Sequence, residues 1–130
     1  MGGIFIDMIE FLAHASSDGR KQSVSEHLHG TAVKAAEFAS AFGAEEQGRL
    51  AGMAHDIGKY SAAFQRRIRG AAEQVDHATA GAAECAKTNE LYAAFAVMGH
   101  HRGLPDGGSR TDSIDSPTFS GGLQRAAKGK

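Results

Sequence analysis

At residues 51–59 the chain reads Ala-Gly-Met-Ala-His-Asp-Ile-Gly-Lys, and this stretch decides both the expected fold and the expected chemistry. Small and apolar residues lead up to His55 and Asp56, and Gly58 follows them as a helix stop. An imidazole and a carboxylate side by side at a helix C-terminus can ligate one metal ion, while the second carboxylate oxygen bridges to another. Lys59 would then point back towards an anion at the same site.

Helical patterns surround this segment from about residue 22 to residue 101. Ser23 and Glu26 form a capping-box signature, and apolar residues follow at helical spacing as far as Gly43. Further helices are expected over about 44–57, from a Ser61 cap through Arg69, over 76–87, and from a Thr88 or Asn89 cap to His100. No segment alternates like a strand, and for the first 12 residues a helix is favoured over a strand.

The amino-acid composition of the sequence changes at Gly103. From there to Lys130 it holds both prolines and many glycine, serine, threonine and aspartate residues, which is typical of loops and linkers. A length of 130 residues suits one domain. We therefore expect an all-α bundle of about five to six helices over residues 1–107, followed by a loop-rich or disordered tail over 108–130.

The charge balance excludes a generally polycationic nucleic-acid binder but permits a local basic groove. The chain has 14 Lys+Arg and 15 Asp+Glu, for a formal net charge of −1. Its single cysteine, Cys85, forms no internal disulfide and is expected to be a small buried residue, which fits a reducing cytoplasm. The apolar N-terminal stretch is too short for a membrane span and is interrupted by Asp7 and Glu10. We expect a soluble cytoplasmic protein.

Seven histidines in 130 residues are the compositional oddity, and several of them stand in ordered motifs. The motifs are Ala13-His14, Ser25-Glu26-His27-Leu28, His55-Asp56-Ile57-Gly58-Lys59, Phe64-Gln65, Asp76-His77-Ala78-Thr79-Ala80-Gly81 and Gly99-His100-His101-Arg102-Gly103-Leu104-Pro105-Asp106. Over about residues 12–107 the chain resembles the HD superfamily of metal-dependent phosphohydrolases. More narrowly, it resembles the HD nuclease domain of the type I CRISPR helicase-nuclease.

This resemblance implies two metal sites that share one carboxylate. The implied ligands of the first ion are His27, His55 and Asp56. The implied ligands of the second ion are Asp56, His77, His100 and His101. The resemblance also makes Asp56 and Lys59 the catalytic residues, with Lys59 on a phosphate oxygen or metal-bound water. The family has one more first-site aspartate downstream, and neither Asp112 nor Asp115 is assigned to it.

The donor chemistry agrees with the resemblance. Phosphodiester cleavage needs an activated water and neutralised phosphoryl charge, which two divalent ions about 3.5–4 Å apart supply. A site dominated by neutral imidazole favours Mn, Fe, Co or Ni, one or two ions per chain, with Mg or Zn less favoured. His100 and His101 can face one ion only if their helix ends there, as Gly103 and Pro105 indicate.

Other polar residues have competing interpretations. The guanidinium groups of Arg66, Arg67, Arg69 and Arg102 form either a track for DNA phosphates or a solvated surface. His29 lies two residues from His27 and is expected to face solvent, whereas the sequence leaves the role of His14 open.

The leading hypothesis is a metal-dependent endonuclease or exonuclease that hydrolyses single-stranded DNA in CRISPR-mediated antiviral defence. Its expected partners are single-stranded DNA, a separate CRISPR helicase and a guide-RNA surveillance complex. The first alternative is an HD-type phosphohydrolase of nucleotides or cyclic nucleotides. The second is a catalytically incomplete HD module with a docking or regulatory role.

Overall fold

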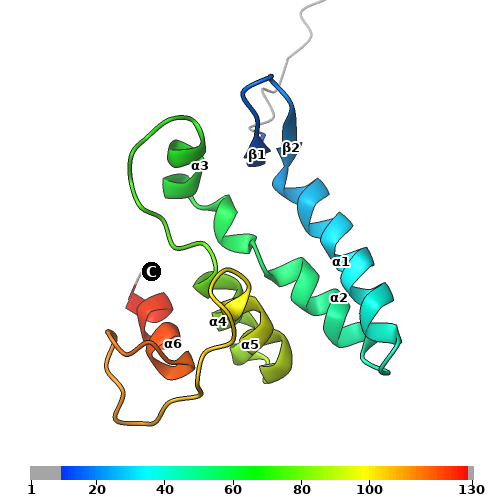
Figure 1. Cartoon of the computed structure of the whole chain (residues 1–130). Helices are drawn as coiled ribbons and strands as arrows, with labels where there is room; N and C mark the ends of the chain where they lie inside the picture. Colours follow the sequence, from blue (N-terminus) through cyan, green and yellow to red (C-terminus); the bar gives the residue numbers. More distant parts are fainter. Residues whose placement is uncertain (1–9, 129–130) are drawn as a thin grey trace, which may run out of the picture.

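The computed structural model describes residues 10–128, which form a mostly helical bundle with one short hairpin (Figure 1). Along these residues the elements are β1 (Leu12–Ala15), β2 (Lys21–Ser23), α1 (Val24–Ser40), α2 (Glu45–Ala54), the 3₁₀-helix η1 (Ile57–Tyr60), α3 (Ala62–Ile68), α4 (Thr79–Lys87), α5 (Leu91–Gly99) and α6 (Phe119–Lys128). The predicted all-α class and helix number are confirmed. None of the helices within 10–128 is long and apolar enough to cross a membrane.

Helices α1 and α2 lie side by side as an antiparallel pair (Figure 1). The predicted capping box is present: the Ser23 hydroxyl accepts the Glu26 N–H, and the Glu26 carboxylate accepts the Ser23 N–H. Small residues recur on the face of α1 that is buried, including Ala32, Ala36 and Ala39. Their small size lets α2 approach α1 closely. This close packing fixes the position of the C-terminal end of α2 and of His55 and Asp56, which follow it.

Removal of this cap gives a first testable prediction. We expect Ser23→Ala to lower the free energy of unfolding by about 1 kcal/mol, because one N-terminal amide of α1 loses its acceptor. Ser25→Ala, two residues on in the same helix, serves as the matched control, since its hydroxyl caps no amide of the helix. Urea denaturation of both variants measures the difference, and equal stabilities would contradict the capping role.

A second cluster of buried residues joins α4, α5 and α6. Ala82, Cys85, Ala94 and Val97 form its centre, and burial raises the pKa of the Cys85 thiol. Cys85 is therefore a small buried residue, as predicted. Phe119 of α6 is also buried there, among residues that come from much earlier in the chain.

The prediction that residues 103–130 form only loop or disordered tail is wrong for 119–128, which form α6. Phe119 stacks on Phe95 of α5, with ring centroids 4.0 Å apart and an interplanar angle of 9°. The glycine pair that resembled a loop allows close packing, because a Cβ at Gly121 would lie 2.1 Å from the Ser116 carbonyl oxygen. Residues 103–118 contain no helix or strand, in agreement with the expected loop.

The absence of strands was also a wrong prediction. β1 and β2 pair antiparallel across a turn that contains Gly19, whose φ is +89°. The two strands are too short to show alternation, and in β1 the buried residues Leu12 and Ala13 are adjacent. The helix favoured for the first 12 residues lies outside the described residues over 1–9, and Leu12 itself is in β1.

Several helix ends differ from the predicted ones, and two of the differences shape the site. α2 ends at Ala54 instead of about residue 57, and α4 begins at Thr79 instead of 76. At the start of α5, Asn89 has a φ of +61° and neither predicted residue caps the helix, whose N-cap is Glu90. His55 and Asp56 therefore stand in a turn, and His77 in the irregular segment before α4, all outside regular helix.

Candidate metal centre

Asp56 occupies the middle of the cluster of histidines. It lies in the turn between α2 and η1, and it is only 3% exposed. One carboxylate oxygen faces histidines from the ends of α4 and α5, and the other faces a histidine of α1. The turn thus presents a single carboxylate to two groups of imidazoles that come from opposite sides of the fold.

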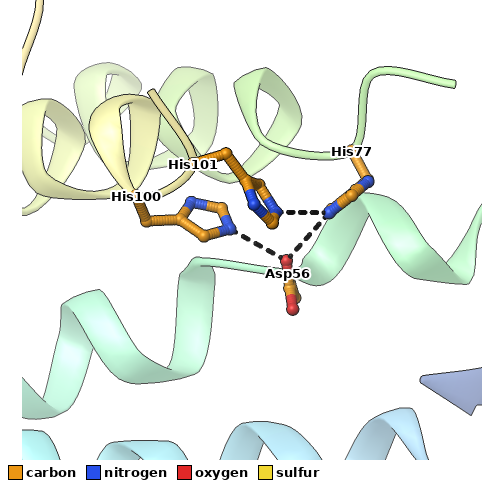
Figure 2. A group of neighbouring side chains, drawn as sticks. All are labelled: Asp56, His77, His100 and His101. Carbon is orange, nitrogen blue, oxygen red and sulfur yellow. Dashed lines mark hydrogen bonds and ion pairs between the residues drawn. The ribbon is translucent and has the colours of Figure 1, made fainter. Parts of the chain in front are cut away.

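The Asp56 oxygen Oδ1 belongs to a group with His77, His100 and His101, the residues predicted for the second ion (Figure 2). His100 Nε2 lies 3.1 Å from Oδ1, and His77 Nε2 lies 3.5 Å from it. His77 Nε2 and His101 Nε2 are 2.8 Å apart. His77 precedes α4, while the adjacent pair follows α5, whose end at Gly99 lets both rings turn inward as the sequence predicted. We call these four residues the second group.

The other oxygen, Oδ2, belongs to a group with His27 and His55. These are the residues predicted for the first ion, so we call them, with Asp56, the first group. His27 Nε2 lies 2.8 Å from Oδ2, His55 Nε2 lies 3.2 Å from it, and the two Nε2 atoms are 3.0 Å apart. His27 comes from the first turns of α1 and His55 from the residue after α2. All six histidine and aspartate residues predicted as ligands are thus brought together in the two groups.

Backbone carbonyls fix the orientation of two of these rings. His55 Nδ1 lies 2.6 Å from the Gly52 oxygen, and His100 Nδ1 lies 2.5 Å from the Val97 oxygen. Since a carbonyl only accepts, each Nδ1 donates its N–H, and in the neutral ring the Nε2 lone pair points into the cluster. Such outer hydrogen bonds are the usual means of orienting a metal-ligating histidine.

The electrostatics of the cluster favour a bound cation. Burial lowers the pKa of His27, His77 and His101, so these rings favour the neutral form that binds metal. Burial opposes ionisation of Asp56, but hydrogen bonds from His100 and His55 outweigh it and hold its pKa far below the usual range. The hydrogen bond to Asp56 raises the pKa of His100. With Nδ1 donating to Val97, a hydrogen bond from Nε2 to Asp56 requires the protonated ring, and a metal ion would have to replace that Nε2 proton.

The spacing of the donor atoms fits a metal ion. Ligand atoms bound to one ion at about 2.1 Å stand roughly 3.0–3.4 Å apart in octahedral or tetrahedral geometry. In the second group three such separations are 2.8, 3.1 and 3.5 Å, and all its ligand atoms lie within 4.8 Å of one another. In the first group the separations are 2.8, 3.0 and 3.2 Å. Several imidazole nitrogens and one carboxylate oxygen converge in each group, so the cluster could hold a divalent ion.

Lys59 points back to the site, as predicted, and it is buried there. Its Nζ lies 3.1 Å from Asp56 Oδ2 and donates to the Ala13 carbonyl at 3.2 Å. The prediction that Gly58 is the helix stop is wrong: α2 ends at Ala54, and Gly58 lies within η1 without a positive φ. A Cβ at Gly58 would lie 2.4 Å from the His77 carbonyl oxygen. Gly58 is required because the segment that carries His77 passes directly over it.

Gln65 is a buried supporting residue to which sequence reasoning gave no role. Its amide group accepts from the Leu12 N–H and donates to the carbonyls of Leu12 and Lys59. It thereby ties β1 to η1 through the backbone of Lys59. The sequence feature that could have indicated this role is a glutamine directly after Phe64, in a helix whose other inward residues are apolar.

Three of the four arginines predicted to contact DNA hold partners within the chain. Arg66 forms an ion pair with Glu73, with Nε 2.6 Å from Oε1, and Arg67 donates to the Glu73 carbonyl. Arg69 donates to Gln65 and to the Glu10 carbonyl. For Arg102 the structure gives no side-chain partner among residues 10–128. Any phosphate contact by the first three arginines therefore competes with an existing interaction.

The remaining candidates lie around the cluster or away from it. His14 is exposed on β1, and its ring centroid is 4.8 Å from that of His27, so it lines the edge of the first group. His29 is exposed, as predicted. Within residues 10–128, neither Asp112 nor Asp115 joins either group; Asp112 accepts hydrogen bonds from Ser109 and Thr118 instead.

Comparison with known proteins agrees with this geometry. The family profile described as "HD domain" matches residues 24–126, which includes every residue of both groups and most of α6. The chain therefore belongs to the HD domain family, whose members are metal-dependent phosphohydrolases. A search of curated proteins found no match.

Proposed function

We propose that this HD domain is a metal-dependent nuclease that hydrolyses phosphodiester bonds of single-stranded DNA in CRISPR-mediated antiviral defence. Its partners in that role are a separate CRISPR helicase, which opens the duplex, and a guide-RNA surveillance complex, which selects it. The observation that carries the proposal is the position of Asp56, whose two oxygens face two different groups of imidazoles.

The chemistry follows from that position. When bound, a pair of divalent ions lowers the pKa of water to near neutrality and neutralises charge on the reacting phosphate. The chain's own contribution is to hold the ligands: Asp56 joins the two groups, and the carbonyls of Gly52 and Val97 orient His55 and His100. Lys59 holds Asp56 in place and adds positive charge beside the first group.

The two groups are expected to differ in affinity. The second group offers three imidazoles and a carboxylate, while the first offers two imidazoles and the oxygen that also faces the Lys59 ammonium. The nearby positive charge opposes a cation, so the second group should bind Mn, Fe, Co or Ni more tightly. Occupancy of one ion at low concentration and two at high concentration is the expected pattern.

Histidine variants test this difference by calorimetric titration with Mn²⁺. We expect His101→Ala to weaken the tighter binding step by at least about 10-fold, since it removes a direct ligand, and His27→Ala to remove the weaker step. His29→Ala is the matched control on α1, because its ring is exposed and outside both groups. A wild-type protein with a single step unaffected by either variant would contradict the two-group assignment.

The nuclease activity is tested with circular single-stranded DNA in the presence of Mn²⁺ or Ni²⁺. We expect nicking followed by degradation, because a circle has no end and its first cut must be internal. EDTA should inhibit the reaction completely, because it removes the metal ions. A parallel panel of nucleotides and cyclic nucleotides separates the alternatives. Hydrolysis of the small esters alone would replace the nuclease by a nucleotide phosphohydrolase. No hydrolysis, with less than one equivalent of metal, would instead favour a docking or regulatory module.

A further inference from the structure

A hollow of about 840 Å³ opens directly beside the second group. It is lined by residues 74–79 and 101–106, together with Met98, Pro117, Thr118 and Arg125. His77 and His101 belong both to the hollow and to the group. A molecule in the hollow would therefore lie next to whatever reacts at the second group.

The wall of the hollow combines two kinds of chemistry. Val75, Met98, Leu104 and Pro105 give it an apolar surface, and Leu104 is 76% exposed. The loop that carries Leu104 is seated on α5, because a Cβ at Gly99 would lie 3.0 Å from the Leu104 Cα. This surface suits the face of a flat, weakly polar ring.

Two arginines supply positive charge at the same hollow. Arg125 is held in place by donating to the carbonyls of Ile114 and Ser116 at 2.6 and 3.0 Å, and the structure gives it no carboxylate partner among residues 10–128. Arg102, next to His101, also lines the hollow, and its guanidinium group has no carboxylate partner among residues 10–128. The Asp76 carboxylate in the same wall already accepts the N–H groups of Ala78 and Thr79.

We propose that this hollow binds the nucleoside adjacent to the scissile phosphate, with Arg102 contacting the next phosphate along the strand. The inference rests on the proposed nuclease function and adds the substrate unit that is held beside the second group. The volume is within the roughly 300–1,000 Å³ typical of small-molecule pockets. An apolar wall for the base and arginines for the phosphate match the two halves of a nucleotide.

The first experiment compares two substrates in Arg102→Gln. One is a short oligothymidylate, which fills the hollow, and the other is bis(p-nitrophenyl) phosphate, which has no second phosphate. We expect the ratio of kcat/KM for the oligothymidylate to that for the small ester to fall about 10- to 100-fold, the value of one lost charged hydrogen bond. Arg110→Gln is the matched control, since Arg110 is exposed in the same loop and does not line the hollow.

The second experiment measures binding without metal, by fluorescence anisotropy of labelled oligothymidylate in EDTA. Arg102→Gln should bind about tenfold more weakly than Arg110→Gln and show a smaller salt dependence, by roughly one released counterion. Equal binding and an equal substrate ratio in the two variants would overturn the assignment of the hollow. A wild type that hydrolyses neither substrate would overturn the proposed function, and the EDTA measurement would still decide the role of Arg102.

Discussion

Asp56→Asn is expected to lower phosphodiester hydrolysis by at least about a thousandfold. An asparagine amide has one oxygen instead of two and no charge, so it cannot serve both groups of imidazoles at once. Loss of several kcal/mol of charge stabilisation at the reacting centre corresponds to this factor, because each 1.36 kcal/mol changes a rate tenfold. Initial rates on single-stranded DNA in Mn²⁺ measure the effect.

The same substitution also affects stability, and a double variant separates the two consequences. Asp56→Asn leaves the buried Lys59 ammonium without its carboxylate, at a cost of about 3 kcal/mol. Adding Lys59→Met removes the uncompensated charge, so the double variant should regain part of the stability and none of the activity. Asp115→Asn is the control, since its exposed carboxylate lies outside both groups. Activity of Asp56→Asn within tenfold of wild type would refute the role of Asp56.

The second large effect is expected from Gly52→Ala, which should lower the free energy of unfolding by about 3 kcal/mol. A Cβ at this position of α2 would lie 2.5 Å from the Ala32 Cα and 2.7 Å from the Ala32 N. These are backbone atoms of α1, so the two helices must separate to relieve the overlap. Since Gly52 also accepts from His55 Nδ1, the displacement carries the ring out of position.

Gly30→Ala is the matched control for this prediction and should have the opposite sign. Gly30 lies within α1, and a Cβ there would meet nothing within 4 Å. Alanine has a higher helix propensity than glycine, so Gly30→Ala should raise the free energy of unfolding by about 0.5–1 kcal/mol. Urea denaturation of both variants tests the pair. Equal stabilities would mean that α1 and α2 are not packed as closely as described.

The parts of the fold that could be predicted from the sequence depend on short-range signals. Ser23 and Glu26 reveal the start of α1 because both partners of the capping box lie within one turn. Ser61 reveals the start of α3 for the same reason, through its bond to the Phe64 N–H. Gly43 has the left-handed φ of +75° expected of a residue that follows a helix.

The parts that could not be predicted depend on contacts between distant residues. α6 contains a glycine pair that resembles a loop, and it is a helix because Phe119 reaches Phe95 and its glycines allow close packing. The β1–β2 hairpin is too short for periodicity, and it is held by Gln65, which is 53 residues away from Leu12. Local propensity carries no record of either contact.

In the site, too, some features could be predicted from the sequence and others required the structure. The types of residue and their motifs identified all six predicted ligands as one constellation, and the structure places the five histidines around the Asp56 carboxylate. The family resemblance implied the division of these ligands into two groups, but the structure was needed to show that one group faces Oδ1 and the other Oδ2. The burial of Lys59 against Ala13 likewise depends on the fold. The ion pair between Arg66 and Glu73 could not be predicted from the sequence either, because the two residues are seven positions apart across the end of α3.

A crystal structure of the protein soaked with Mn²⁺, with ions located by anomalous scattering, tests most directly whether Asp56 joins two metal sites. We expect an ion bound by Asp56 Oδ1 and the histidines of the second group, and at higher concentration a second ion beside Oδ2. Anomalous peaks only elsewhere on the molecule, with the imidazole cluster unchanged, would contradict this role of Asp56.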